Sequence, residues 1–228
     1  MASASRTAAL VWLCLLYAPP VFAETGDDLA ARERMIEMEA RRHPESREAR
    51  LSLAKLLHFR AVDGDANAAS RSTQLLEGLA SERGDDPLVL AYLGSARLVA
   101  ARLSWNPWRK RSLVREGLDL MDRSVADAPD DPEVRFMRGA STRPLPRYFG
   151  RSELSSQDLS AAASHANPAV ASGRLDKELA AAIFYLYGFT LLDHGDRGGT
   201  ERAWRTAIEI APASKAGRKA AGRLAAAH

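Results

Sequence analysis

Cysteine is almost absent from this chain, because Cys14 is the only one in 228 residues. A single thiol cannot form an intramolecular disulfide, so packing and polar contacts must hold the fold together. Cys14 also follows Leu13, whereas the modified cysteine of a lipoprotein signal follows a small residue. The sequence therefore excludes a disulfide framework and argues against a lipid anchor at Cys14.

Patterns that mark catalytic and cofactor sites are also missing. The five histidines are far apart and form no H-x-x-x-H pair, so they predict no metal site. The chain has no G-x-S-x-G elbow, no phosphate-binding Gly-Lys-Ser/Thr loop and no dinucleotide-binding glycine motif. Acidic pairs such as Asp27-Asp28 are typical of solvated helix faces. We therefore expect no catalytic residue, no metal and no cofactor, and a protein that is not an enzyme.

Long hydrophobic runs are confined to the N-terminus. Apolar residues extend from Ala8 to Ala18 after the single charge of Arg6, and Pro19-Pro20 end this run. Eleven helical residues at ~1.5 Å each cover about 16 Å, which is too short for ~30 Å of hydrocarbon. Val21-Phe22-Ala23 then supplies small residues where a signal peptidase cuts. We predict a signal peptide over residues 1–23, a periplasmic location in a bacterium, and no transmembrane segment after cleavage.

Alternating runs of valine, isoleucine and threonine are missing too, whereas alanine, leucine, arginine and glutamate are abundant. Asp-Asp-Pro occurs at 85–87 and again at 130–132. An aspartate cap followed by a proline in the first turn is a strong helix start. The sequence thus predicts an all-α protein. The predicted helices lie near 27–42, 46–62, 66–82, 86–103, 110–127, 131–142, 152–164, 175–194, 198–210 and 213–226.

A pattern near the C-terminus resembles the tetratricopeptide repeat (TPR), which pairs two helices. Its signature is aromatic-x2-Leu-Gly-x2-Tyr on the first helix and Ala-x3-Phe on the second, before a proline. This chain reads Phe184-x2-Tyr187-Gly188-x2-Leu191 and then Thr200-x3-Trp204-x2-Ala207-x4-Pro212. Gly188 and Pro212 are 24 residues apart, the spacing of the family. A glycine lets the paired helix approach closely, and the aromatic residues fill the space around that contact.

Earlier copies share this phase but have longer connections. Gly94 precedes Pro129 by 35 residues, and Gly139 precedes Pro168 by 29. Gly139 follows Pro129 by ten residues, as an uninterrupted array requires. The second helices of these copies read Gly117-x3-Met121-x2-Ser124-x4-Pro129 and Ser156-x3-Ser160-x2-Ala163-x4-Pro168. A degenerate first copy uses Leu76 and Leu79, with Gly84 in place of the proline.

The resemblance implies a right-handed solenoid of antiparallel helix pairs. We expect an N-terminal helix or cap over 24–45 and a repeat domain over 46–228, with about four repeats and a capping helix near 213–226. The family usually has apolar or aromatic residues at the positions of Arg97, Arg135 and Arg138. We therefore expect those helix faces to be more exposed to solvent or locally rotated. The stack is also expected to change direction around 169–174. The residues with repeat-structural roles are Gly94, Pro129, Gly139, Pro168, Phe184, Gly188, Trp204, Ala207 and Pro212.

Two stretches contain basic residues and no acidic ones. They cover 96–115, with six Lys and Arg, and 135–151, with five, although the whole chain is close to neutral at a net charge of +3. Both contain inserted residues, and stacking of repeats would place the insertions along one edge. The aromatics there either close the loops onto the stack, with the arginines balanced by neighbouring acids, or form a partner-binding rim. The candidate partner-binding residues are Trp105, Trp108, Arg109, Arg111, Arg115, Arg143, Arg147, Tyr148 and Arg151.

The resemblance implies a protein-interaction adaptor, and the predicted signal peptide places it in the bacterial cell envelope. Such an adaptor would bind a partner protein or peptide, with acidic segments favoured by charge, through a concave groove and the basic rim. The alternative is binding or sensing of an anionic envelope component, either a lipid head group or a cell-wall fragment. Nucleic acid is not expected as a partner, because an exported protein rarely meets it.

Overall fold

The computed structural model describes residues 26–226, and this range forms ten α-helices and one short 3-10 helix without any strand. The predicted signal peptide lies outside the described residues. The all-α prediction is confirmed. The helices are α1 (Gly26–Arg42), α2 (Arg47–Val62), α3 (Ala66–Glu82), α4 (Pro87–Leu103), α5 (Pro107–Asp127), α6 (Pro132–Thr142), η1 (Arg147–Phe149), α7 (Ser152–Ala171), α8 (Lys177–Asp193), α9 (Arg197–Ile210) and α10 (Lys215–Ala225).

The predicted helix starts at the two Asp-Asp-Pro motifs are confirmed. The Asp86 carboxylate accepts hydrogen bonds from the backbone N–H groups of Leu88 and Val89, and Pro87 opens α4. Asp131 caps α6 in the same way, with Pro132 as its first residue. The side chains therefore satisfy donors that have no partner inside the helix, and each proline occupies a position where no donor is needed.

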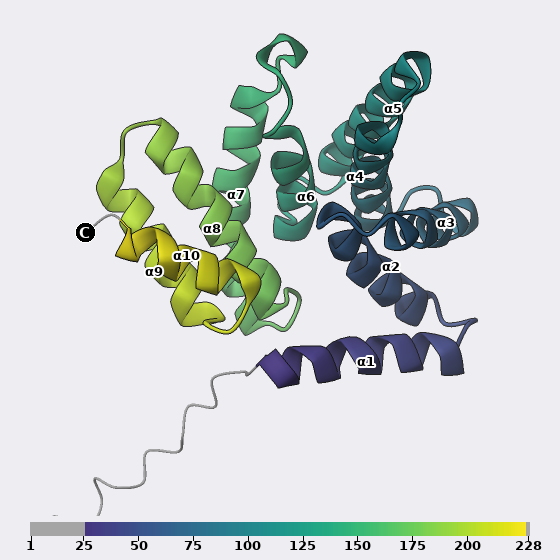
Figure 1. Cartoon of the computed structure of the whole chain (residues 1–228), viewed down its shortest axis with the longest axis horizontal. Helices are drawn as coiled ribbons and strands as arrows, with labels where there is room; N and C mark the ends of the chain where they lie inside the picture. Colours follow the sequence, from purple (N-terminus) through teal and green to yellow (C-terminus); the bar gives the residue numbers. More distant parts are fainter. Residues whose placement is uncertain (1–25, 227–228) are drawn as a thin grey trace, which may run out of the picture.

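Consecutive helices pack as antiparallel pairs, α2 with α3, α4 with α5, α6 with α7 and α8 with α9, and α10 covers α8 and α9 (Figure 1). One contact recurs at the centre of these pairs. The hydroxyl of Ser72 donates to the carbonyl of Ala54 at 2.8 Å, and Ser155 donates to Gly139 at the same distance. Thr200 donates to the carbonyl of Gly188 at 3.2 Å. A small residue on the first helix thus meets a small or hydroxyl residue on the second in each of these pairs.

The α4–α5 pair has the same contact with glycine on both sides. A Cβ added to Gly94 would lie 2.6 Å from the carbonyl oxygen of Gly117, and a Cβ added to Gly117 would be equally close to that of Gly94. Neither position can hold a side chain without moving the backbone of its neighbour. This is the close helix approach that the sequence pattern predicts for Gly94.

The predicted register of the third repeat is wrong by one residue. Ser155 and Leu159 face α6 and are buried, whereas the predicted Ser160 is exposed. The error comes from Pro168, which the repeat pattern places at the end of the helix. Pro168 lies inside α7, which continues past it to Ala171. Ala166 and Ala169 lie on the same face as Leu159 and are fully packed, whereas Pro168 is exposed, and their burial favours continuing the helix despite the hydrogen bond that proline lacks.

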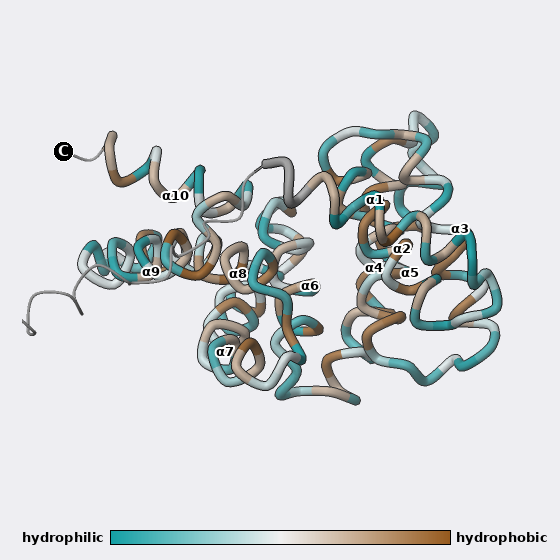
Figure 2. The backbone as a smooth tube through the Cα atoms, turned by 90° about the horizontal axis from the view of Figure 1, so that it is seen from below, coloured by the Kyte–Doolittle hydropathy of each residue, from teal (hydrophilic) through white to brown (hydrophobic). Residues whose placement is uncertain are grey.

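The core runs through both helices of each pair. Four residues after each central contact a large side chain is buried, and these residues are Leu76, Met121, Leu159 and Trp204. Much of the remaining core is alanine, which allows the helices to approach closely. Along the helices, brown hydrophobic and teal hydrophilic residues alternate, as expected when only one face is buried (Figure 2).

Ion pairs connect the two ends of the array. The guanidinium of Arg32, on α1, pairs with Asp176 and Glu178 at the start of α8, each at 2.5 Å. Lys215, at the start of α10, pairs with Asp63 in the turn after α2. In Figure 1, α1 extends from the start of α2 toward the foot of α8. The first and last repeats are therefore joined directly as well as through the array between them.

Candidate partner-binding surfaces

The first inserted segment forms a protruding helical hairpin. The turn Ser104–Asn106 joins α4 and α5, and the Asn106 side chain accepts hydrogen bonds from the backbone N–H groups of Trp108 and Arg109. Trp105 is 93% exposed and Trp108 is 79% exposed. These two predicted aromatics do not close the turn onto the stack, which leaves the rim interpretation open.

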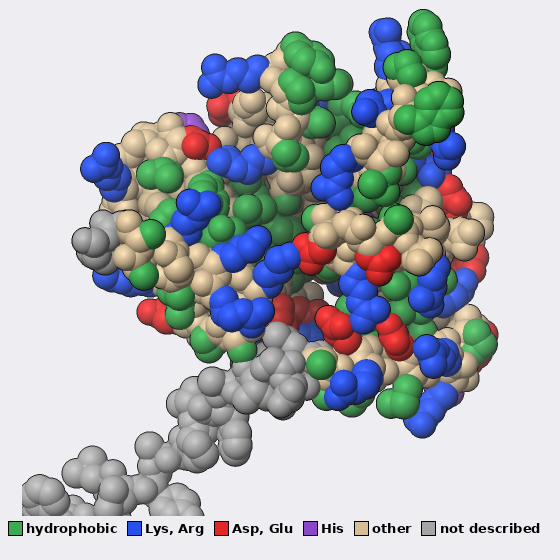
Figure 3. Space-filling view, viewed as in Figure 1, with side chains coloured by type: hydrophobic (Ala, Val, Ile, Leu, Met, Phe, Trp, Pro, Cys, Tyr) green, Lys and Arg blue, Asp and Glu red, His purple; other side chains and the backbone are tan. Residues whose placement is uncertain are grey.

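The second inserted segment connects α6 with α7 through η1. Tyr148 is 82% exposed and its ring lies 4.6 Å from that of Phe149, centroid to centroid. In Figure 3 hydrophobic side chains sit beside Lys and Arg at both inserted segments, and open space separates the two. The structure thus brings the predicted aromatics to one edge of the molecule without joining them into one patch.

The predicted rim arginines fall into two groups. Arg143 pairs with Asp193 and Arg151 pairs with Asp122, both at 2.8 Å. These two side chains are balanced by acids of other helices. The others are exposed and form no ion pair with residues 26–226, and they are Arg109, Arg111, Arg115 and Arg147.

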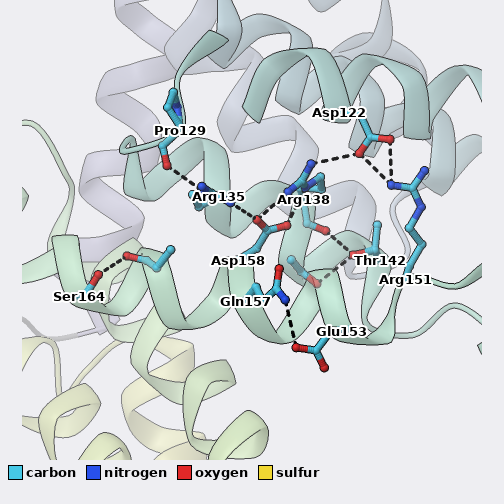
Figure 4. A network of polar contacts seen from close by, with 12 residues as sticks. Asp122, Pro129, Arg135, Arg138, Thr142, Arg151, Glu153, Gln157, Asp158 and Ser164 are labelled. Carbon is cyan, nitrogen blue, oxygen red and sulfur yellow. Dashed lines mark hydrogen bonds and ion pairs between the residues drawn. The ribbon is translucent and has the colours of Figure 1, made fainter. Parts of the chain in front are cut away.

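A buried ion network explains two of the unusual arginines of the repeat pattern (Figure 4). Asp158 of α7 is 0% exposed, and its carboxylate accepts hydrogen bonds from Arg135 at 2.8 Å and from Arg138 at 2.6 and 2.9 Å. Arg138 also bonds to Asp122, which in turn binds Arg151. Burial lowers the pKa of Arg138, but the charge and hydrogen bonds of Asp158 and Asp122 outweigh it and raise the pKa overall. These arginines therefore join α5, α6 and α7 instead of facing a partner.

Arg97, the third unusual arginine, is also held within the fold. Its guanidinium pairs with Glu77 of α3 at 2.7 Å and with Glu116 of α5 at 2.8 Å. The arginine therefore bridges the helices on either side of α4.

A surface that the sequence analysis missed lies where α6, α8 and α10 meet. The Phe189 ring is half-buried, with the guanidinium of Arg143 at 5.8 Å from its centroid and that of Arg223 at 5.3 Å. Tyr185 packs edge-on against Phe189 at 5.2 Å. We call these four residues the α8 surface. The tertiary structure brings Arg223 to Phe189 from 34 positions further along the chain, so no local motif could have shown it.

Basic residues surround this surface. The exposed face of α10 carries Lys215, Arg218, Lys219 and Arg223, and residues 210–226 contain no acid. Figure 3 shows a hydrophobic hollow in this part of the molecule with Lys and Arg side chains around it. The acid-free run of α10 is a sequence signal comparable to the two basic stretches at the inserted segments. Its role only becomes visible once α10 is placed over α8.

Polar residues also line the contact between α2, α4 and α6. The Glu133 carboxylate accepts a hydrogen bond from the Tyr92 hydroxyl at 2.7 Å and pairs with Lys55 at 2.5 Å. Nearby, the buried His58 ring is bonded through Nε2 to the Ser95 hydroxyl at 3.0 Å. Desolvation by burial lowers the pKa of His58 to about 4. This histidine is therefore neutral near pH 7 and serves as part of the core.

Neither a metal-binding cluster nor a membrane-spanning helix occurs within the described residues. No group of three or more His, Cys, Asp or Glu side chains in 26–226 is arranged to hold a metal ion. Within the same part of the chain, every helix is too short or too polar to cross a bilayer.

Comparison with solved structures identifies the fold. A thermophilic TPR protein of Thermus thermophilus, TTC0263, matches with a TM-score of 0.59 and 14% sequence identity, over 87% of this chain and 91% of that chain. MamA matches over 81% of this chain and 89% of its own at 14% identity, with a TM-score of 0.42. No family model and no curated protein sequence matches. The likeness to TTC0263, together with the recurring helix-pair contact, shows that the chain has the helical repeat fold of TPR proteins.

Proposed function

We propose that this protein is a binding scaffold of the bacterial cell envelope, which holds an acidic segment of a partner protein on the α8 surface. The proposal is carried by the position of Phe189 between the guanidinium groups of Arg143 and Arg223. An aromatic ring flanked by two arginines offers apolar contact and positive charge at one place. Such sites favour a ligand that combines an apolar side chain with carboxylates.

The two arginines differ in how available they are. Arg143 already pairs with Asp193, whereas Arg223 forms no ion pair within the described part of the chain. We expect Arg223 and the neighbouring cations of α10 to meet the carboxylates of the partner, while Phe189 and Tyr185 supply the apolar contact. Protein interfaces often concentrate their binding free energy in a few such aromatic and arginine side chains.

The scaffold role can be tested by capture from the native cell envelope. The parent chain, a Phe189→Ala/Arg223→Glu variant and an Arg71→Glu variant would be used as baits, and the recovered proteins identified. Arg71 is exposed on α3 and serves as the matched charge control. We expect specific partners to be recovered by the parent and the control but lost by the α8-surface variant. Equal recovery of the same proteins by all three baits would exclude the α8 surface as the binding site.

The envelope location is part of the proposal and has its own test. Residues 1–30 fused to a reporter that is active only outside the cytoplasm should give signal, and the mature chain should begin at Glu24. Full-length protein in the cytosolic fraction would contradict the location and leave the binding role to be tested there.

A further inference from the structure

Two exposed aromatic tips project from one edge of the array. The first tip is the end of the α4–α5 hairpin, residues 102–112, and the second is the α6–α7 connection, residues 144–150. Figure 1 places both at the edge opposite α1. We propose that these tips bind the surface of an anionic lipid bilayer, with Trp105, Trp108 and Tyr148 at the level of the lipid head groups.

The first tip has no role in the core. Burial in α4 ends at Ala101 and resumes in α5 at Gly117, so the residues between them extend the hairpin beyond the packed array. Leu103 is exposed together with Trp105 and Trp108. Large apolar side chains gathered on a surface usually mark a place of contact with a partner or membrane.

The shape of the tips favours a bilayer over a protein. Asn106 caps α5, and the three-residue turn before Pro107 holds Trp105 at the extreme end of a narrow hairpin. A protein partner would need a matching cavity for each of two convex tips that stand apart. A bilayer interface accepts both without such a fit, and tryptophan and tyrosine are enriched there because their rings are apolar with one polar group.

The charge of the tips favours anionic lipid. Arg109, Lys110 and Arg111 lie in the first two turns of α5 beside the tryptophans, and Arg147 lies beside Tyr148. All four of these basic side chains are exposed. The stretch 96–115, which contains the three on α5, has no Asp or Glu. Basic residues next to interfacial aromatics bind anionic lipid phosphates and add to the apolar contribution. This proposal uses different residues from the α8 surface and does not depend on the function proposed above.

Vesicle binding tests the proposal with the chain from Glu24 onward, which contains every helix described. Sedimentation would compare vesicles of phosphatidylglycerol and phosphatidylcholine with vesicles of phosphatidylcholine alone. We expect the parent to bind the anionic vesicles, and Trp105→Ala/Trp108→Ala to lower the affinity about tenfold or more. Arg109→Ala/Arg111→Ala should lower it by a similar factor, whereas the control Arg71→Ala/Arg83→Ala should not.

Fluorescence adds a readout that is specific to the tips. Lipids brominated in the acyl chains should quench the emission of Trp105 and Trp108 but not that of buried Trp204, which remains in the double alanine variant. Equal vesicle binding by the parent and the tryptophan variant would overturn the proposal, as would a parent that does not sediment. If polyglutamate instead binds with the same dependence on Arg109 and Arg111, the tips are a protein-binding site.

Discussion

Gly188 shows how one residue sets the distance between two helices. A Cβ at this position would lie 2.3 Å from Nε1 of Trp204, and that indole N–H donates to the carbonyl of Tyr185 at 3.1 Å. The ring therefore cannot move aside without losing its hydrogen bond. This is the contact that the 24-residue spacing from Gly188 to Pro212 predicts.

We predict that Gly188→Leu overpacks this contact and lowers the free energy of unfolding by roughly 1–3 kcal/mol, measured by thermal or denaturant unfolding. The matched control is Gly78→Ala in the middle of α3, where a Cβ meets nothing within 4 Å. That substitution should stabilise the helix by about 0.5–1 kcal/mol. A Gly188→Leu melt identical to the parent's would show that the close contact is not needed.

His58 couples the stability of the fold to pH. Because burial lowers its pKa from 6.5 to about 4, the unfolded chain binds more protons than the folded one between these values. Its contribution to stability is therefore complete above pH 6.5 and is lost as the pH falls toward 4. The groups around the ring are the Ser95 hydroxyl and the Phe59 and Tyr92 rings.

We predict that the His58 contribution lost over this range is on the order of 3 kcal/mol. The measurement compares the free energy of unfolding of the parent and His58→Gln across the pH range. Carboxylates titrate in both proteins, so the difference between the two curves isolates the histidine. Parallel curves would mean that His58 does not set this dependence.

At the scale of helices, the Asp158 network adds a buried polar contact to the apolar packing between α6 and α7. The carboxylate is fully buried and bonded to two arginines, and the hydroxyl of Ser155, one turn earlier, bonds to Gly139. An ion pair of this kind gains little over a hydrophobic pair, but removing one member leaves charge without a partner. The network therefore specifies how the two helices pair more than it increases their stability.

We predict that Asp158→Asn lowers the free energy of unfolding by about 3–5 kcal/mol, because Arg135 loses its counter-charge and Arg138 keeps only that of Asp122. Asp119→Asn, on the exposed face of α5, should change it by no more than about 0.5 kcal/mol. Asp158→Leu/Arg138→Met should cost less than the single substitution, since the most buried ion pair is removed as a whole and only Arg135 is left without its partner. Denaturant unfolding measures all three, and a mild effect of Asp158→Asn would argue against a tight network.

At the scale of the whole molecule, the contact between Lys215 and Asp63 joins residues 152 positions apart. An extended repeat array would keep these two residues at opposite ends. Together with the pairs of Arg32, this contact means that the array curves back, so that α1 reaches the start of α8 and α10 reaches the turn after α2. The surface between them is shaped by the whole array instead of by one repeat.

We predict that a carbodiimide, which joins an amine to a carboxylate without a spacer, links Lys215 to Asp63 within one chain. Mass spectrometry of the digested monomer should find the joined peptides, and Lys215→Arg should abolish them because the guanidinium does not react in this way. Finding the link only in dimers, or not at all, would contradict the closed arrangement.

The helices and the last repeat could be predicted from the sequence because their signals are local. Aspartate caps, first-turn prolines and the 3.6-residue pattern of apolar positions act within one helix or one turn. The register of α7 could not be predicted in the same way. Pro168 is a local signal for a helix end, but burial of Ala166 and Ala169 against neighbouring helices outweighs it.

The candidate surfaces also combine features set by local sequence with features set by contacts between distant residues. The aromatic and basic composition of the inserted segments was readable from the chain, and Trp105, Trp108 and Tyr148 are exposed there. The sequence alone did not show which arginines pair with acidic residues. Arg143 and Arg151 look equivalent to Arg147 in the sequence, yet acids of α8 and α5 balance the first two. Those acids come from distant positions, so only the folded chain brings them close.

By itself, the sequence determined where most of the helices begin, which residues are small enough for helix contact, and where basic charge gathers; α5 begins at Pro107, three residues before the predicted start. Each of these depends on backbone hydrogen bonding, side-chain size or composition over short spans. Only the tertiary structure decided that Phe189 lies between Arg143 and Arg223, that Asp158 is buried with two arginines, and that α10 meets the turn after α2. These contacts depend on how all the helix pairs stack, because a small rotation at each pair changes which distant residues meet.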